Sequence, residues 1–349
     1  MQNRLKTLLE LVVLPALILA FFSAGVSAMG LSLKANWSDG SMPELADLNN
    51  DSVYEIVGTF NFNPLYQVNV WYGNGTVYGN WPASAALTVN EYPAVGDING
   101  GGEKEIIFTD QYFNGNLSVY QSTGIAMWSN DLCSLEGGIY ESSPALVDLD
   151  GNGALDIIAT CHIMFMYTSL YALDSQGNPV LGWDTPKMIN ETGVSPATSS
   201  DIIVISGGDA IFGIPFFVHA FYINGTEAWF VYPDGESPTL SSFKFPVIGN
   251  VDADAEEEIV VTGYGDLSSK IFVLEKNGSL ENSWDANQTT PPSSTVLSDL
   301  NGDGAQDIVV YWNDTVYAWS GNSSLLWSQY VGQGILPPGS NNAPVVADI

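Results

Sequence analysis

The stretch that decides the fold reads Ser143-Pro144-Ala145-Leu146-Val147-Asp148-Leu149-Asp150-Gly151-Asn152-Gly153-Ala154-Leu155-Asp156-Ile157-Ile158-Ala159-Thr160. A short apolar run precedes the polar loop and a second one follows it, which is typical of two strands joined in a β-hairpin. Residues 169–173 form a third β-rich run, and a turn and Trp183 close the unit. The pattern therefore predicts a unit of four short strands.

The loop at residues 148–156 carries oxygen-bearing side chains at alternating positions. Asp148, Asp150 and Asn152 can turn their oxygens toward one point, and Gly153 supplies the positive φ that such a curl needs. The carbonyl of Ala154 and the carboxylate of Asp156 can complete the shell. Calcium takes about six to eight oxygen ligands, and this spacing begins a calcium loop. Because β-forming residues flank it, we expect a calcium loop within a hairpin rather than an EF-hand.

Equivalent loops recur along the chain. They start at Asp47, Asp97, Asp148, Asn250, Asp299 and Asp348, which are 49–51 residues apart except for one double step of 102. The double step predicts a repeat without a loop, with Ser195-Pro196-Ala197 and residues 201–204 as its first two strands. Each unit also closes on a tryptophan that follows a turn, at Trp81, Trp128, Trp183, Trp229, Trp284 and Trp327.

Repeats of roughly 40–50 residues with four strands each are typical of β-propellers. We therefore predict an all-β fold, a propeller with six complete four-stranded blades and calcium loops between the first and second strands. Lys34-Ala35-Asn36-Trp37 matches the last strand of a unit, and residues 343–349 match a first strand. The two ends predict parts of a seventh blade, and we expect the natural chain to continue past Ile349.

The motif Pro-Ala-x-x-x-Asp-x-Asx-Gly-Asx-Gly-x-x-Asp-Ile-Ile is clearest at residues 144–158 and 298–310. It resembles the FG-GAP/VCBS repeat of integrin-like β-propellers. Leu170-Tyr171-Ala172-Leu173-Asp174-x-x-Gly with a following tryptophan is similar to the tryptophan-docking repeat of quinoprotein-like (PQQ-type) propellers. The resemblance covers nearly all of residues 31–349. It implies blades with calcium loops on one face, and binding or adhesion more often than catalysis, although function must come from a site.

Five of the six loops have a predicted strand on each side, and these five differ in their predicted ligands. The loops at Asp148 and Asp299 are complete, whereas Ser52 and Ala255 stand where glycine is expected, at some cost in strain. We expect the loop at Asp97 to bind most weakly, because Gly101 offers no side chain. Without metal, each loop would be an Asx-turn that ties a hairpin. The predicted ligands are Asp148, Asp150, Asn152, Ala154, Asp156, Asp299, Asn301, Asp303, Ala305, Asp307, Asp47, Asn49, Asp51, Val53, Glu55, Asn250, Asp252, Asp254, Glu256, Glu258, Asp97, Asn99, Glu103 and Glu105.

Residues 1–28 have the pattern of a secretory signal peptide, which leaves residues 29–349 as the propeller domain. Arg4 and Lys6 precede an apolar run at residues 11–22, and Val26-Ser27-Ala28 fits a cleavage site. An uncleaved membrane anchor is the alternative, since residues 8–28 are nearly long enough to span a bilayer. We expect the mature chain to be extracellular or on the cell surface.

The charge of the chain argues against two classes of partner. The net charge is −31, from 39 acidic and 8 basic residues. Removing residues 1–28 takes away two bases and one acid, which gives −32 and leaves no arginine. Phosphate recognition depends on arginine and lysine, so nucleic acid and anionic lipid are unsuitable partners.

Two kinds of covalent modification are compatible with export. Cys133 and Cys161 could form one disulfide or remain buried free thiols. Asn-x-Ser/Thr sequons could carry glycans, and Asn50 is the least suitable because it lies within a calcium loop. The sequons start at Asn36, Asn50, Asn74, Asn116, Asn190, Asn224, Asn277, Asn287, Asn313 and Asn322.

No catalytic constellation stands out in the sequence. His162 and His219 lack partners at zinc spacing, and no Gly-x-Ser-x-Gly elbow is present. The acidic pairs recur from unit to unit and fit calcium better than a glycosidase site. We therefore predict a non-enzymatic, calcium-binding scaffold for an extracellular glycan or protein. The alternatives are a secreted carbohydrate-active lyase or hydrolase, the propeller part of a larger enzyme, or a surface-layer component.

Overall fold

Alternating apolar runs and turn residues fold this chain into consecutive antiparallel sheets. The computed structural model describes residues 11–13, 18–19, 33–36, 44–62, 65–81, 92–109, 116–131, 133, 142–163, 167–189, 195–209, 214–235, 242–243, 245–252, 254–265, 269–286, 288, 292–330 and 345–346. Every named element within these residues is a β-strand. No helix in this part of the chain has the length and apolar character needed to cross a membrane.

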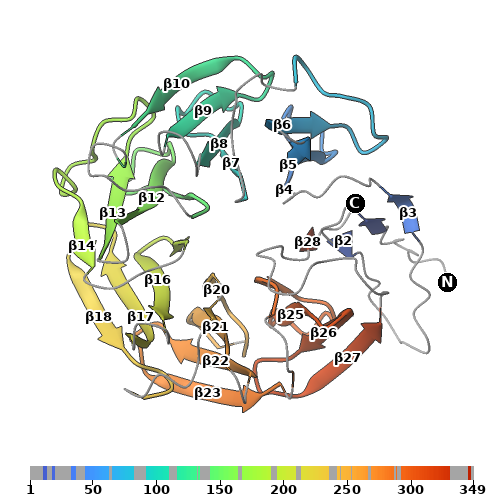
Figure 1. Cartoon of the computed structure of the whole chain (residues 1–349), viewed down its shortest axis with the longest axis vertical. Coiled ribbons are helices and arrows are strands. Elements are labelled where there is room, and N and C mark those ends of the chain that lie inside the picture. The colour runs from blue at the N-terminus through green and yellow to red at the C-terminus, as the bar shows by residue number, and fades with distance from the viewer. Residues whose placement is uncertain are drawn as a thin grey trace.

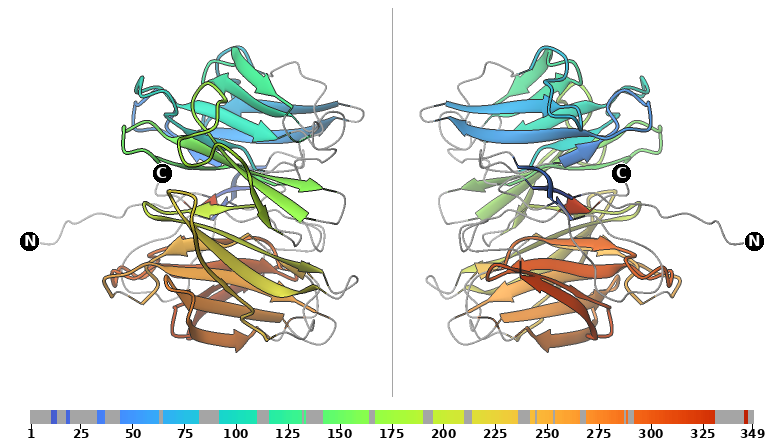
Figure 2. Two further views of the ribbon diagram at one scale, coloured as in Figure 1. Left: turned by 90° about the vertical axis from the view of Figure 1, so that its left-hand side faces the viewer. Right: turned by 90° about the vertical axis from the view of Figure 1, so that its right-hand side faces the viewer.

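The sheets stand in a ring as six blades, so the predicted all-β propeller is confirmed (Figures 1 and 2). In each blade the strands follow one another from the centre outward; the fifth blade has an additional short strand that pairs with its long inner strand, and the first blade has three described strands. The strands are, by blade, β4 (Glu44–Ala46), β5 (Glu55–Phe62) and β6 (Leu65–Trp71); β7 (Ala94–Gly96), β8 (Glu105–Thr109), β9 (Leu117–Gln121) and β10 (Ala126–Asn130); β11 (Ala145–Val147), β12 (Asp156–Ile163), β13 (Tyr167–Leu173) and β14 (Lys187–Ile189); β15 (Ala197–Thr198), β16 (Ile202–Asp209), β17 (Ile214–Tyr222) and β18 (Glu227–Val231); β19 (Ser242–Phe243), β20 (Val247–Gly249), β21 (Glu258–Tyr264), β22 (Ser269–Glu275) and β23 (Leu280–Asp285); β24 (Thr295–Ser298), β25 (Asp307–Trp312), β26 (Thr315–Trp319) and β27 (Leu325–Tyr330).

The register of each first hairpin places the predicted calcium loop at its tip. In the third blade, Ala145 pairs with Ile158 and Val147 pairs with Asp156, so the intervening residues form the loop. The first strands lie side by side around the ring centre, in the order β4, β7, β11, β15, β20 and β24. Because the strands are antiparallel, these loops share one face of the ring with the turns between third and fourth strands.

The hydrophobic core lies between neighbouring blades. Ile157 and Ile158 are both fully buried, yet successive strand residues point to opposite faces. Ile157 packs with residues of the second blade, and Ile158 packs with residues of the fourth. Burial on both faces explains why the second strands are continuous apolar runs instead of alternating ones.

The repeated tryptophans bind each blade to the next. Their indole Nε1–H groups donate to carbonyls in the next blade's outer turn, over 2.7–2.9 Å, for Trp81 to Ser122, Trp128 to Ser175, Trp183 to Ile223 and Trp229 to Lys276. Trp284 departs from this pattern, since its buried Nε1 has no partner among the described residues. The equivalent carbonyl, that of Gly321, accepts from Asn282 Nδ2 at 3.0 Å.

The two end segments form strands between the first and last blades (Figure 1). β28 (Val345–Val346) lies beside β24, the place of a further first strand, and pairs in parallel with β2 (Ile18–Leu19). β3 (Leu33–Asn36) pairs in parallel with β1 (Leu11–Val13). The predicted end strands thus exist, but each pairs with residues from the predicted signal segment.

The two cysteines are joined in a disulfide. Cys133 follows the second blade and Cys161 lies on β12 of the third, with a Cα–Cα distance of 5.5 Å. Both residues are fully buried in the core between these blades. Of the two alternatives that the sequence left open, a disulfide or two free thiols, the structure has the disulfide. The bond links the two blades covalently.

Candidate metal centres

All five predicted loops share one hydrogen bond at their base. The last acid of each loop accepts the backbone N–H of the loop's second residue and is itself buried, at most 4 % exposed. The closing acids with their donors are Glu55 with Leu48 (2.9 Å), Glu105 with Ile98 (3.1 Å), Asp156 with Leu149 (2.9 Å), Glu258 with Val251 (2.7 Å) and Asp307 with Leu300 (2.9 Å). Each bond uses one carboxylate oxygen and leaves the other for a further contact.

The alternating side chains curl every loop through Asx-turns. In all five loops, the side-chain oxygen of the third residue accepts the backbone N–H of the fifth residue. In the third blade, the Asn152 N–H donates to Asp150 Oδ1 over 3.1 Å. In four loops, the side-chain oxygen of the fifth residue accepts the backbone N–H of the seventh residue. In the third blade, the Ala154 N–H donates to Asn152 Oδ1 over 2.7 Å. The Asx-turns that the sequence suggested are present, and they place the predicted ligands in one curl. The remaining bonds of this kind involve Asp51 with Asn49 and Val53, Gly101 with Asn99, Asp254 with Asp252 and Glu256, and Asp303 with Asn301 and Ala305.

Left-handed residues at the fourth and sixth positions make the curl. In the third blade these are Gly151 (φ 75°) and Gly153 (φ 89°), and the carboxylate of Asp148 accepts from both of their N–H groups. In the first blade the same places hold Asn50 (φ 60°) and Ser52 (φ 67°). The strained positive φ expected at Ser52 is therefore confirmed.

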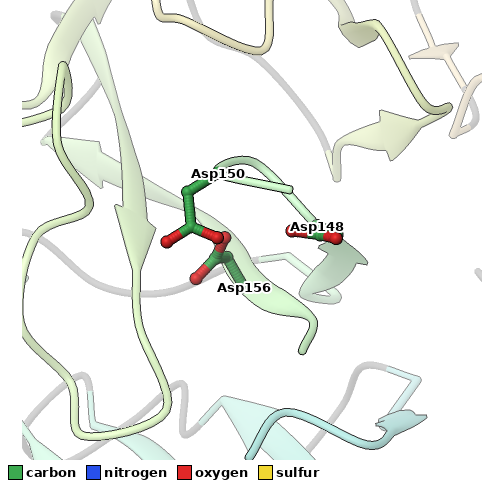
Figure 3. A group of neighbouring side chains, drawn as sticks. All are labelled: Asp148, Asp150 and Asp156. Carbon is green, nitrogen blue, oxygen red and sulfur yellow. The ribbon is translucent and has the colours of Figure 1, made fainter. Parts of the chain in front are cut away.

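Three carboxylates converge in the third-blade loop. Oxygens of Asp148, Asp150 and Asp156 lie within 4.8 Å of one another. Figure 3 shows Asp150 and Asp156 facing each other, with Asp148 at their side. Burial, together with the neighbouring charges of Asp150 and Asp148, raises the pKa of Asp156 to about 6. The arrangement fits a divalent cation, since hard oxygen ligands are what calcium prefers.

The fifth-blade loop brings together Asp252, Asp254 and Glu258, also within 4.8 Å. Burial raises the pKa of Glu258 to about 7. Its leading residue behaves differently, because Asn250 donates from Nδ2 to the carbonyl of Asp254 at 2.7 Å. Ala255 is not among the described residues with positive φ, so this loop avoids the strain that the sequence predicted there.

The third residue of each loop decides which side chains converge. Among the described residues, groups of three acids gather only in the two loops with aspartate there, at Asp150 and Asp252. In the loops at Asp97 and Asp299 an asparagine amide lies against the closing acid instead. Asn99 Nδ2 donates to Glu105 at 2.5 Å, and Asn301 Nδ2 lies 3.5 Å from Asp307. Asp299, predicted as a complete site, therefore has fewer converging carboxylates than Asp148.

The first-blade loop has a buried oxygen without a hydrogen-bond partner in the described part of the chain. Glu55 is fully buried, and its Oε1 meets no donor among these residues. Burial raises the pKa of Glu55, and the charges of Asp51 and Asp47 raise it further. An unpaired buried carboxylate oxygen beside two more carboxylates is costly, and a bound cation would offset that cost.

The loops also connect neighbouring blades. Leu155 N–H donates to the Asp97 carbonyl at 2.9 Å, and Gln306 N–H donates to the Asn250 carbonyl at 2.8 Å. Asn50 Nδ2 donates to the Gly102 carbonyl at 2.7 Å, close to the predicted ligand Glu103. The conformation of each of these loops is therefore coupled to the contacts between neighbouring blades. The sequence pattern did not reveal this coupling.

The fourth blade lacks the loop, as predicted. A tight turn joins β15 and β16, with Ser199 N–H donating to the Ile202 carbonyl at 2.9 Å. Lys276 of the fifth blade binds Asp201 in this turn and lies 3.4 Å from Glu257. A lysine ammonium thus links blades four and five where the repeat has lost its acidic loop. The sequence gives no local signal for this ion pair, because its members are far apart along the chain.

Comparisons with solved structures support the propeller fold. The crystal structure of BBS1N in complex with ARL6DN matches with a TM-score of 0.59 and 10% identity, covering 87% of this chain and 84% of that one. The biofilm matrix protein Bap1 of V. cholerae matches with a TM-score of 0.52 and 13% identity, covering 87% of this chain and 70% of that one. No family profile and no curated protein matches the sequence. At such low identity the likeness establishes a β-propeller and nothing finer.

Proposed function

We propose that this chain is an exported calcium-binding β-propeller that acts as a non-catalytic scaffold for an extracellular glycan or protein. The observation that carries the calcium assignment is the recurring buried closing acid with one oxygen engaged by the backbone. In the first blade the other oxygen, Glu55 Oε1, is buried and unsatisfied. In the third and fifth blades two further carboxylates approach the closing acid. The FG-GAP/VCBS resemblance of the loops supports the same assignment.

Three features support export and an extracellular partner. The disulfide between Cys133 and Cys161 belongs to an oxidising compartment. The signal-like residues 1–28 would direct the chain there. The net charge of −31 with 8 basic residues disfavours nucleic acid and anionic lipid surfaces.

Counting bound calcium ions by native mass spectrometry tests the metal assignment. We expect several ions on the wild-type chain after exchange into millimolar calcium, and none after chelation. Asp148→Ala should remove one ion, because it takes away one of the three carboxylates that converge in this loop. Asp131→Ala, which alters an exposed acid just after β10, at the opposite end of its blade from the loops, is the control and should keep the full count. A wild-type chain that binds no calcium would refute the assignment.

Binding to a glycan array and to extracellular proteins of the source organism tests the scaffold role. The protein should bind its glycan or protein ligand in calcium and lose this binding in chelator, because loops without calcium would loosen and disturb the contacts between blades. Turnover of a bound glycan, seen as released fragments, would instead favour the carbohydrate-active enzyme that the sequence left as an alternative.

A further inference from the structure

The outer turns of four blades carry the same potential modification site. We propose that Asn74, Asn224, Asn277 and Asn322 carry N-linked glycans. Each begins an Asn-x-Ser/Thr sequon in the turn that follows the third strand of its blade. Each precedes the residue whose N–H closes that turn, namely Gly75, Gly225, Gly278 and Ser323. The four sites are therefore structurally equivalent and lie on the face that carries the loops.

The four turns present the asparagine amide in the same way. Oδ1 of each asparagine accepts the backbone N–H of the sequon's Ser or Thr over 2.9–3.0 Å, from Thr76, Thr226, Ser279 and Ser324. In the two threonine turns the hydroxyl also donates to that Oδ1 over 2.7 Å. The asparagines are exposed, and their Nδ2 groups bond to no described residue. The oxygen is thus held against the backbone while the nitrogen remains open to reagents.

The exposed nitrogen is the atom that glycan transfer requires. Nδ2 forms a bond to the anomeric carbon of a lipid-phosphate-linked oligosaccharide, and the bond from that carbon to the phosphate oxygen breaks. The lipid phosphate leaves with the electron pair, and the proton lost from Nδ2 passes to it or to solvent. No oxidation or reduction is involved.

Two other sequons, those of Asn50 and Asn313, differ from the four turns in ways that predict no modification. Asn50 Nδ2 donates to the Gly102 carbonyl within the calcium-loop face, so its nitrogen is engaged. Asn313 has positive φ, and its sequon hydroxyl, that of Thr315, donates to the Asn313 backbone carbonyl at 3.4 Å. The equivalent turn position holds Thr123 in the second blade and Gln176 in the third. Among the outer turns, glycans would therefore follow the arc of blades four, five, six and one and be absent from those of blades two and three.

Peptide mass spectrometry of the protein isolated from its source tests this proposal, which rests on the proposed export. Chymotryptic peptides with the four turn asparagines should carry hexose- or hexosamine-containing additions, while the peptide with Asn50 should not. Equal modification of Asn50, or four bare turns on protein recovered outside the cell, would overturn it. Bare turns on protein retained inside the cell would overturn the export proposal together with it.

Two variants at one turn distinguish glycan attachment from a role of the turn itself. Thr226→Ala should abolish modification of Asn224, whereas Thr226→Ser should keep it. The turn should fold in both, because the Asn277 turn has only the backbone bond from Ser279 and still forms. Modification of Asn224 that persists in Thr226→Ala would contradict sequon-directed transfer.

Discussion

At the residue scale, His219 makes stability depend on pH. Its ring is buried between Phe221 and Phe230 and lies 3.2 Å from Glu227. Burial lowers the pKa of His219 below 6.5, although Glu227 opposes this shift. The folded state therefore favours the neutral ring, so this contribution is full above pH about 6.5 and is lost as the pH falls below it.

His219→Phe should remove that pH dependence. We expect the free energy of unfolding of wild type to fall more between pH 7 and pH 5 than that of the variant, by urea titration in calcium. Because the prediction concerns the difference between wild type and variant, the contributions of the other titrating acids to the free energy of unfolding cancel. Parallel pH curves for wild type and variant would show that His219 does not contribute.

Gly278 is required both for its backbone angle and for the space that it leaves. Its φ is +85°, and a Cβ there would lie 2.6 Å from the ring of Trp229. Gly278→Ala should cost about 3 kcal/mol, from left-handed strain and overpacking together. Gly235→Ala is the control, since Gly235 has φ +81° and open space around it, and should cost only about 1–2 kcal/mol. Equal losses in thermal unfolding would mean that the contact with Trp229 is unimportant.

At the element scale, the indole hydrogen bonds hold adjacent blades together. Trp229→Phe removes the bond to the Lys276 carbonyl and leaves that carbonyl unpaired. Trp284→Phe removes a similar ring whose Nε1 has no described partner. We expect Trp229→Phe to be more destabilising by about 1 kcal/mol, the net worth of one hydrogen bond. Chemical denaturation measures both variants, and a reversed order would contradict the docking role.

The sequence predicted repeating elements well because their signals are local. The period near 50 residues located the hairpins, the loop of Asp148 and the fourth blade that lacks one. Long-range contacts could not be predicted in this way. The Cys133–Cys161 pairing, the Lys276 ion pair and the link from Asn50 to Gly102 all join different repeats. The sequence also predicts that the loop at Asp299 is as complete as the loop at Asp148. In the structure the Asp299 loop differs, because the amide of Asn301 faces the closing acid Asp307.

At the scale of the whole molecule, calcium should stabilise the ring through the loops. Extracellular calcium modules bind at roughly 10⁻⁴ to 10⁻³ M, so millimolar calcium should add about 0.5–1.5 kcal/mol per filled site. The melting temperature should therefore rise on moving from chelator to calcium and change little in magnesium. Asp148→Ala should lose part of this rise, whereas Asp97→Ala should lose little. Identical melting in all three conditions would leave the loops as metal-free Asx-turns.

Anomalous diffraction from crystals grown in calcium is the most direct test that these loops are metal centres. The arrangement of carboxylates predicts peaks between Asp148, Asp150 and Asp156, between Asp252, Asp254 and Glu258, and beside the unsatisfied Oε1 of Glu55. It predicts none at the tight turn of Asp201, where Lys276 supplies the positive charge. Crystals in millimolar calcium with no peak in any acidic loop, or with a peak at Asp201, would contradict the account.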